Sequence, residues 1–165
     1  MGNNFEIERK FLIEYPDTRQ LEAHDGSSVC EIVQTYLSSP EGEERRVRQR
    51  KEKGKVTYFK TLKKQIRDVK RIEEEYEITA KEYEKLLEQA DTQKRPIEKT
   101  RYSLSYQKKV LEIDIYPFWS DKAIVEVELE DEDEEIDFPD FLKVIKEVTN
   151  DRNYKNSELA KGNER

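Results

Sequence analysis

The segment Phe5-Glu6-Ile7-Glu8-Arg9-Lys10-Phe11 carries the pattern that decides the fold. Its residues alternate with the period of two that is typical of a β-strand. One face of this strand is apolar, and the other carries two acids and one base, Glu6, Glu8 and Lys10. A single strand of this kind could simply turn its charges to water. The same alternation recurs along the chain, however, so the charged faces need a common explanation.

The composition of the 165 residues indicates one folded domain, spanning 1–165, with a lean core. Charged residues make up 42% of the chain and hydrophobic residues 34%. Nine Tyr, six Phe and the regular alternation nevertheless favour a β-rich domain over disorder. The net charge of −7 argues against a nucleic-acid partner. We expect a monomer or a homodimer.

Cysteine usage and the absence of long apolar runs favour a cytoplasmic protein. Cys30 is the only cysteine, so no internal disulfide can form and a reducing compartment fits. No apolar run is long enough for a signal peptide or a membrane span. We therefore expect no membrane partner.

Seven more segments alternate in the same way and are predicted to be strands. They are 29–37, 44–50, 55–63, 71–78, 97–106, 111–116 and 123–130. Lys53-Gly54 is typical of a hairpin turn between two of them. The polar segment 66–70 is predicted to be a loop.

Two amphipathic helices are predicted beside the strands. The first begins at Thr79, which forms a capping box with Glu82, and it ends at Arg95-Pro96. The second is expected over 138–148, with Pro139 near its start and apolar residues along one side. Shorter helical pieces are expected over 18–23 and 157–161.

Eight strands joined mostly by short turns predict an antiparallel barrel or sandwich. An ordinary barrel places its apolar faces inside, and every charge would then face water. In that orientation the two helices would have no apolar sheet surface to cover. We therefore expect a mainly β, α+β protein: an eight-stranded antiparallel β-barrel with a charged lumen, apolar outer faces and flanking helices.

This orientation would gather six cations and eight anions around the lumen. The cations are Lys10, Arg46, Arg48, Lys63, Lys99 and Arg101, and the anions are Glu6, Glu8, Glu75, Glu77, Glu112, Asp114, Glu126 and Glu128. So many buried charges need partners. Carboxylate pairs suit hard divalent cations such as Mg²⁺ or Mn²⁺, and the Arg and Lys side chains suit a phosphate chain. A solvated position stays open for Arg50, Glu73, Glu130 and Lys155, and Glu112 could either be an acceptor in the lumen or orient a cation.

Seven motifs occur in an order that resembles the CYTH superfamily, the triphosphate tunnel metalloenzymes. They are Glu6-Ile7-Glu8-Arg9-Lys10, Arg46-Val47-Arg48, Thr61-Leu62-Lys63, Glu75-Tyr76-Glu77, Lys99-Thr100-Arg101, Glu112-Ile113-Asp114 with Glu126-Val127-Glu128, and Tyr154-Lys155-Asn156 with Leu159-Ala160. The resemblance covers nearly the whole chain. One position departs from it, because Asn153 stands directly before Tyr154 where the family often has Arg.

The resemblance implies a metal-dependent triphosphatase that converts inorganic triphosphate to phosphate and pyrophosphate. It implies that Glu6, Glu8, Glu126 and Glu128 hold Mg²⁺ or Mn²⁺. The six cations would bind the phosphates, with Lys10 also counted among the catalytic residues. A second metal ion, or a carboxylate such as Glu75, Glu77 or Asp114, would orient the attacking water. Thiamine triphosphatase, nucleoside triphosphatase, class IV adenylate cyclase and a non-catalytic polyphosphate- or nucleotide-binding module remain as alternatives.

Overall fold

The structure is a computed structural model that describes residues 5–67 and 70–162. Within these residues the strands are β1 (Phe5–Glu14), β2 (Ser28–Leu37), β3 (Glu43–Glu52), β4 (Lys55–Arg67), β5 (Lys70–Ile78), β6 (Ile97–Tyr106), β7 (Lys109–Ile115), β8 (Lys122–Leu129) and β9 (Val144–Glu147). The helical pieces are α1 (Thr18–Ala23), α2 (Ala80–Leu86), α3 (Asn156–Leu159) and the 3₁₀ turns η1 (Leu87–Gln89) and η2 (Arg152–Tyr154).

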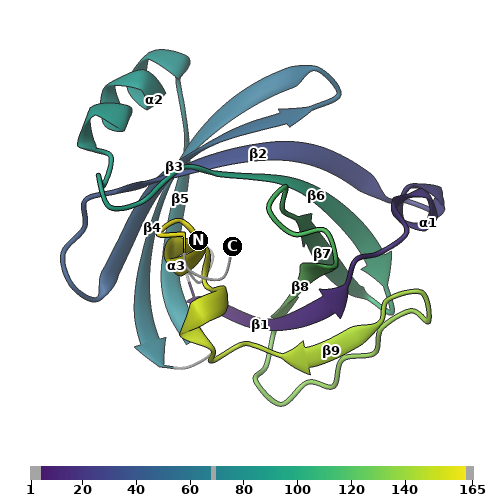
Figure 1. The fold of residues 1–165 in the computed structure, drawn as a ribbon. Coiled ribbons are helices and arrows are strands. Elements are labelled where there is room, and N and C mark those ends of the chain that lie inside the picture. Colours follow the sequence, from purple (N-terminus) through teal and green to yellow (C-terminus); the bar gives the residue numbers. More distant parts are fainter. Residues whose placement is uncertain (1–4, 68–69, 163–165) are drawn as a thin grey trace.

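Strands β1 to β8 form a closed antiparallel barrel (Figure 1). Their order is β5-β4-β3-β2-β6-β7-β8-β1, and pairing of β1 with β5 closes the ring. One edge of β1 pairs with β8, whereas its other edge pairs first with β5 and then with β9. The eight-stranded antiparallel barrel predicted from the sequence is confirmed.

The apolar faces of the strands point outward, as predicted, and are covered by other elements. Helix α2 lies over Val47 of β3 and packs against it through Tyr83. Its capping box is present, because Thr79 and Glu82 each accept a hydrogen bond from the other's backbone N–H. On another side of the barrel, Leu21 of α1 packs in a second buried cluster with the outer faces of β1, β7 and β8.

No helix forms over 138–148, so that prediction is wrong. The residues from 138 to 142 form turns whose apolar side chains pack on the outer face of the barrel. Strand β9 follows and pairs with β1 (Figure 1). Because β1 leaves β5 after Ile7, β9 satisfies backbone groups along the edge that β5 no longer covers. The β-branched Val144 and Ile145 suit a strand, although their spacing also fits a helix.

Other predicted boundaries shift by a few residues. Helix α2 ends at Leu86 and continues only as η1, so it is shorter than expected. Most of the predicted loop 66–70 belongs to β4 and β5, and residues 68–69 lie outside the described residues. The turn at Lys53-Gly54 is confirmed, with φ angles of 51° and 80°.

One end of the barrel interior is apolar, which the sequence analysis did not predict. Leu12 on β1 and Ile124 on β8 are register partners, and each continues a strand face that carries charges further along. Tyr154 and the segment around α3 pack against them and fill this end (Figure 1). Along β7 the exposed fraction of the side chain rises from 0% at Asp114 to 36% at Glu112. Solvent therefore reaches the charged interior from the end opposite the apolar cluster.

Candidate active site

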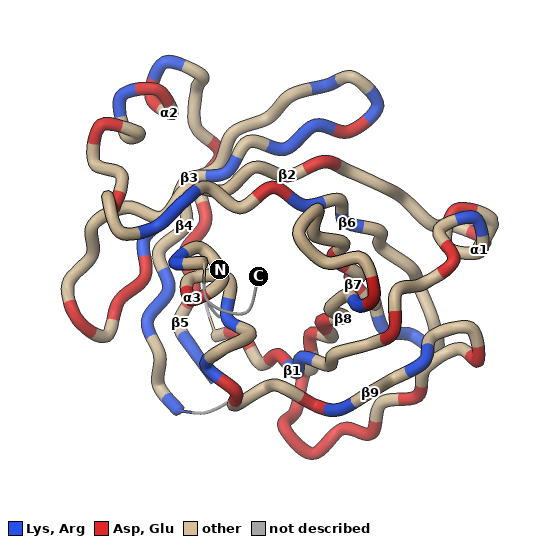
Figure 2. Tube along the Cα trace, viewed as in Figure 1, with Lys and Arg blue, Asp and Glu red and all other residues tan. Residues whose placement is uncertain are grey.

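A cavity of about 550 Å³ occupies the charged part of the barrel interior. Every strand from β1 to β8 contributes at least one lining side chain, and the segment from Val148 to Glu158 contributes more. The described residues that line it include ten carboxylates and nine cationic side chains, one net negative charge. Figure 2 shows acidic and basic positions on strands all around the ring. The charged strand faces therefore converge on one space.

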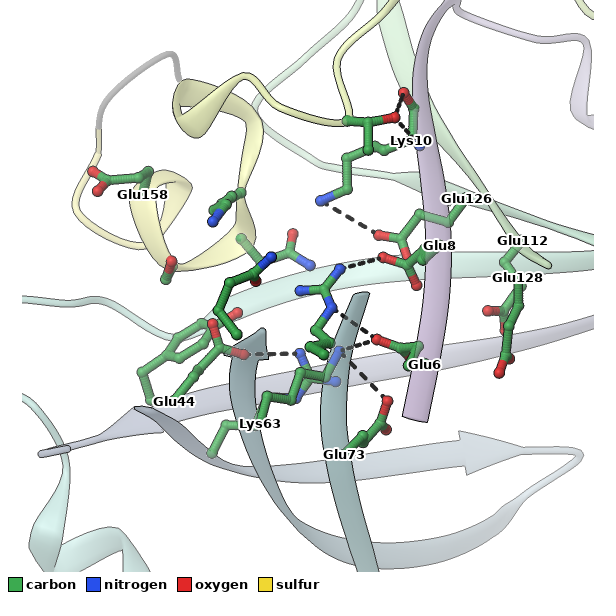
Figure 3. A pocket seen from close by; sticks show the side chains of 18 of the residues that line it. Glu6, Glu8, Lys10, Glu44, Lys63, Glu73, Glu112, Glu126, Glu128 and Glu158 are labelled. Carbon is green, nitrogen blue, oxygen red and sulfur yellow. Dashed lines mark hydrogen bonds and ion pairs between the residues drawn. The ribbon is translucent and has the colours of Figure 1, made fainter. Parts of the chain in front are cut away.

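The structure brings together all of the predicted phosphate-binding and metal-binding residues. Both sets line the cavity: Lys10, Arg46, Arg48, Lys63, Lys99 and Arg101, with Glu6, Glu8, Glu126 and Glu128. Figure 3 shows Glu6, Glu8, Glu126 and Glu128 in one part of this cavity, with Lys10 beyond them. Glu75, Glu112 and Lys155 line it as well. Residues that are more than 120 positions apart in sequence, such as Glu6 and Glu128, thus share one site.

Glu77 does not line the cavity, although the sequence analysis placed it facing the lumen. It lies opposite Phe59 of β4 and is exposed. The inward carboxylates of β5 are Glu73 and Glu75. Alternation alone fits residues 73, 75 and 77 equally well, since all three share one strand face. Only the position at which β5 leaves the cavity separates them.

Asp114 differs from its predicted role for another reason. It is fully buried and accepts hydrogen bonds from Lys99 Nζ at 2.8 Å, Arg101 Nε at 2.7 Å and Arg101 Nη2 at 2.9 Å. Those two cations hold the pKa of Asp114 below its usual value, against the effect of burial. A carboxylate occupied in this way has little left with which to orient water. Asp114 instead fixes the positions of Lys99 and Arg101.

Three other cations of the cavity rest against carboxylates of the same strand or of another strand. Arg48 Nη2 lies 2.6 Å from Glu75 Oε1, and Lys10 Nζ lies 3.6 Å from Glu126 Oε1. Arg46 Nη1 is 3.7 Å from an oxygen of Glu44. Few of these pairs are fork-to-fork contacts, and several are longer than an ordinary hydrogen bond. An incoming polyanion can therefore take over these cations without breaking many strong bonds.

Several cavity residues were missed or left open by the sequence analysis, among them Glu44, Arg71 and Glu73. Arg71 is the most informative of them. Its Nε lies 3.0 Å from Glu6 Oε1, and its Nη2 lies 3.0 Å from Glu8 Oε1. All three share the strand parity of a predicted site residue: Glu44 and Glu73 lie two places before Arg46 and Glu75, and Arg71 lies four places before Glu75. That parity is a signal that could have found them.

Burial changes the ionisation of the carboxylates on β1. It raises the pKa of Glu6 to about 7, and with repulsion from Glu126 it raises that of Glu8 to about 8. Burial also acts on Glu126, but Lys10 and Arg101 hold its pKa well below the usual range. At neutral pH the carboxylates of β1 are thus poorly neutralised by the protein alone. They would gain from a further cation.

The donor set of this region fits a hard divalent cation. Glu6, Glu8, Glu126 and Glu128 offer only carboxylate oxygens, which are the ligands that Mg²⁺ and Mn²⁺ prefer. Glu8 and Glu128 are register partners on adjacent strands. Within residues 5–67 and 70–162, however, no three acidic, His or Cys side chains are gathered as a ready metal group. Side-chain rearrangement or substrate oxygens would complete the coordination.

The C-terminal segment also reaches the cavity. Arg152, Lys155 and Asn156 line it, whereas Asn153 does not. The side chain of Arg152 is 81% exposed, and Arg152 Nη2 lies 3.7 Å from Glu158 Oε1. The departure from the family pattern at Asn153 therefore leaves one basic residue, Arg152, at the rim of the cavity.

A closed antiparallel barrel with a cation-rich, carboxylate-rich interior defines a class of protein that handles compact polyanions inside a β-barrel. The chain belongs to the CYTH domain family, whose sequence pattern matches residues 4–161. It is 36% identical over 159 residues to an inorganic triphosphatase of Nitrosomonas europaea, covering 94% of this chain and 96% of that protein. It is 31% identical over 157 residues to an inorganic triphosphatase of Acetivibrio thermocellus, covering 94% and 93%.

Solved structures agree with this assignment. The crystal structure of the inorganic triphosphatase NE1496 matches with a TM-score of 0.58 and 33% identity, covering 94% of each chain. The PH1819 protein of Pyrococcus horikoshii OT3 has the same TM-score at 21% identity and covers 78% of this chain and 80% of its own. That second match supports the fold alone. Among the described residues, no helix has the length and apolar character needed to cross a membrane.

Proposed function

We propose that this protein is a divalent-metal-dependent inorganic triphosphatase, which hydrolyses tripolyphosphate to phosphate and pyrophosphate. The observation that carries the proposal is the convergence of nine cationic side chains on one barrel cavity that also holds a set of inward carboxylates. A triphosphate is a compact polyanion, and its phosphoryl transfer depends mainly on positioning and on stabilising charge. The two curated relatives, at 31% and 36% identity over nearly the whole chain, support the same activity.

The proposed metal ligands are Glu6, Glu8, Glu126 and Glu128, and the ion is Mg²⁺ or Mn²⁺. When bound, the ion would neutralise phosphate oxygens and polarise the phosphorus that is attacked. The role of the carboxylates is to offer oxygen ligands on two adjacent strands. Burial raises the pKa values of Glu6 and Glu8, and the nearby Lys63 and Arg71 offset this effect only in part.

The proposed phosphate ligands are the cations of β1, β3, β4 and β6: Lys10, Arg46, Arg48, Lys63, Lys99 and Arg101. Arginine can bind two phosphate oxygens at once, and lysine supplies a compact charge. Lys99 and Arg101 are held in place by Asp114, so their positions do not depend on the substrate. These groups would stabilise the charge that develops on the pyrophosphate leaving group, Lys10 being one of them.

The proposed water-orienting group is Glu75, with Glu73 beside it on β5. A water oxygen bonds to the terminal phosphorus while the bridging P–O bond breaks, and pyrophosphate leaves with the bridging oxygen. The proton of the water passes to a carboxylate or to solvent. Glu75 is suitable because its side chain lines the cavity and is still 34% exposed, so that water can reach it.

An activity assay tests the proposal. Purified protein is incubated with Mg²⁺ or Mn²⁺ and with tripolyphosphate, ATP or thiamine triphosphate, and released phosphate and cyclic AMP are measured together. We expect phosphate release chiefly from tripolyphosphate, because Tyr36 is the one aromatic side chain among the described lining residues and it is 2% exposed. Glu8→Gln and Arg48→Ala should each lower the rate by about 10²-fold or more. Cyclic AMP formation, a preference for an organic triphosphate, or tight binding without turnover would each overturn the proposal.

A further inference from the structure

We propose that Arg71 is a further functional residue that exchanges partners during the reaction cycle. In the metal-free protein its guanidinium holds Glu6 and Glu8 together, and when a divalent cation binds these carboxylates it turns to the triphosphate. This inference rests on the metal site proposed above. It adds a positioning and phosphate-binding role at a residue outside the recognised motifs.

The contacts of Arg71 place its guanidinium between the two carboxylates of β1. One nitrogen lies 3.0 Å from an oxygen of Glu6 and another lies 3.0 Å from an oxygen of Glu8. Glu6 and Glu8 are alternate residues on one strand face, and both point into the cavity (Figure 3). Arg71 and Glu6 are also register partners of the β1–β5 pairing that closes the barrel. The backbone therefore fixes Arg71 directly opposite Glu6 and close to Glu8.

A cation that binds Glu6 and Glu8 must compete with this guanidinium. Its contact with Glu8 is a charge-assisted hydrogen bond, which is among the stronger kinds in proteins, and its contact with Glu6 is an ion pair. The absence of a ready metal group among the described residues agrees with carboxylates that are already engaged. Once a divalent ion neutralises these carboxylates, their attraction for the Arg71 guanidinium weakens. The position of Arg71 on β5 still keeps its side chain inside the cavity.

The triphosphate offers Arg71 its next partner. The same cavity is lined by Lys63 of β4 and by Lys155, so the released guanidinium would join other cations around a phosphate. The planar fork of arginine suits two phosphate oxygens as well as it suits two carboxylates. Lys63, like Arg71, lies between two carboxylates, with its Nζ 3.5 Å from Glu6 and 3.9 Å from Glu73. Metal and triphosphate should therefore favour each other's binding. The metal ion replaces Arg71 at the carboxylates, and the triphosphate binds the guanidinium that is released.

Binding of Mn²⁺ alone, followed by electron paramagnetic resonance of the free ion, tests the first half. We expect Arg71→Gln to bind Mn²⁺ about tenfold more tightly than the wild type, because no hydrogen-bonded guanidinium has to be displaced. Arg71→Lys keeps the charge but cannot span both carboxylates, and it should also bind Mn²⁺ more tightly. Mn²⁺ affinities of both variants equal to that of the wild type would overturn the inference.

Arg48→Gln is the matched control for the loss of one positive charge. Arg48 lines the same cavity, but its ion pair is with Glu75. We expect its Mn²⁺ affinity to change much less than that of Arg71→Gln. An equal gain in the two variants would mean that only the overall charge of the cavity matters, and it would also overturn the inference.

The KM for tripolyphosphate at saturating Mn²⁺ tests the second half. Arg71→Gln should raise it about tenfold or more, although the metal binds more tightly. An unchanged KM would contradict the role in phosphate binding. Glu8→Gln separates this inference from the proposed metal site: if that variant keeps wild-type Mn²⁺ affinity, the metal assignment itself is wrong. If it loses Mn²⁺ binding while Arg71→Gln behaves as wild type, only the role of Arg71 fails.

Discussion

Glu75 and Glu77 differ in position relative to the cavity although they lie on the same face of one strand. Glu75 lines the cavity and accepts hydrogen bonds from Arg48 and from the Thr61 hydroxyl, whereas Glu77 is exposed outside it. We expect Glu75→Gln to lower kcat for tripolyphosphate by about 10²-fold, because a neutral amide cannot accept a proton from water. Glu77→Gln is the matched control and should stay within about twofold of the wild type. A reversed order of the two rates would place the working carboxylate at Glu77.

The raised pKa values of Glu6 and Glu8 predict how the stability of the metal-free protein depends on pH. Their pKa values are about 7 and about 8 in the folded state, against an ordinary value of 4.5. Between these limits the folded state binds more protons than the unfolded state, so the stabilising effect of these groups falls as pH rises. In EDTA, the Tm of the wild type relative to a Glu6→Gln, Glu8→Gln double variant should therefore decrease from pH 5.5 to 8.5. A constant difference would show that the two carboxylates are not perturbed by the fold.

Individual charged residues were largely predictable, because period-two alternation places a side chain on one face or the other. The burial of each charged side chain and its ion-pair partners were not predictable. Asp114 and Glu75 have the same sequence signature, yet one is buried between two cations and the other faces solvent and Arg48. Which of them is free to act on water depends on neighbours supplied by other strands.

At the level of the elements, the hairpin between β6 and β7 has an unusual turn. Gln107 and Lys108 have φ angles of 48° and 67°, a left-handed conformation that costs a residue with a Cβ about 1 kcal/mol or more. We expect Lys108→Gly to raise the free energy of unfolding by about 0.5–1 kcal/mol, since glycine adopts this conformation without strain. Chemical denaturation measures this change.

A lysine with ordinary strand geometry provides the control for that turn. Lys64 is exposed on β4. Lys64→Gly should lower the free energy of unfolding by about 0.5–1 kcal/mol, because glycine weakens a strand interior. Similar losses in both variants would indicate that the positive φ at Lys108 carries no strain.

The strands were predictable as elements, and the failure at 138–148 shows why the second helix was not. Its apolar residues recur at helical spacing, but the segment divides into turns and the edge strand β9. The reason lies in β1, whose edge becomes available where β5 ends. A local pattern cannot report an unpaired edge that is formed by residues more than 130 positions away, such as Phe11 and Glu147.

The charge balance of the cavity makes a prediction for the whole molecule. With ten carboxylates against nine cations, the described lining does not neutralise a triphosphate by itself. Tripolyphosphate should therefore raise the Tm only together with Mg²⁺, by about 5–10 °C at a hundred times its Kd. Glu75→Gln is the protein to use, because the ligand must survive heating. An equal shift in EDTA would show that the cations suffice without metal.

The overall architecture was predictable from one argument about orientation. The predicted helices need an apolar sheet surface to cover, so the apolar faces of the strands must point outward. The apolar filling of one end of the barrel was not predictable in the same way. Leu12 and Ile124 continue charged faces, and their significance appears only when the C-terminal residues fold back against them. That contact joins the first strand to the last helix and has no local sequence signal.

This filling closes the barrel at one end of its axis. A linear polymer cannot pass through a channel that is closed at one end. A long phosphate chain would therefore have to enter by one of its ends and be shortened from that end. The fragments would then leave by the route of entry, because the other end of the barrel is filled.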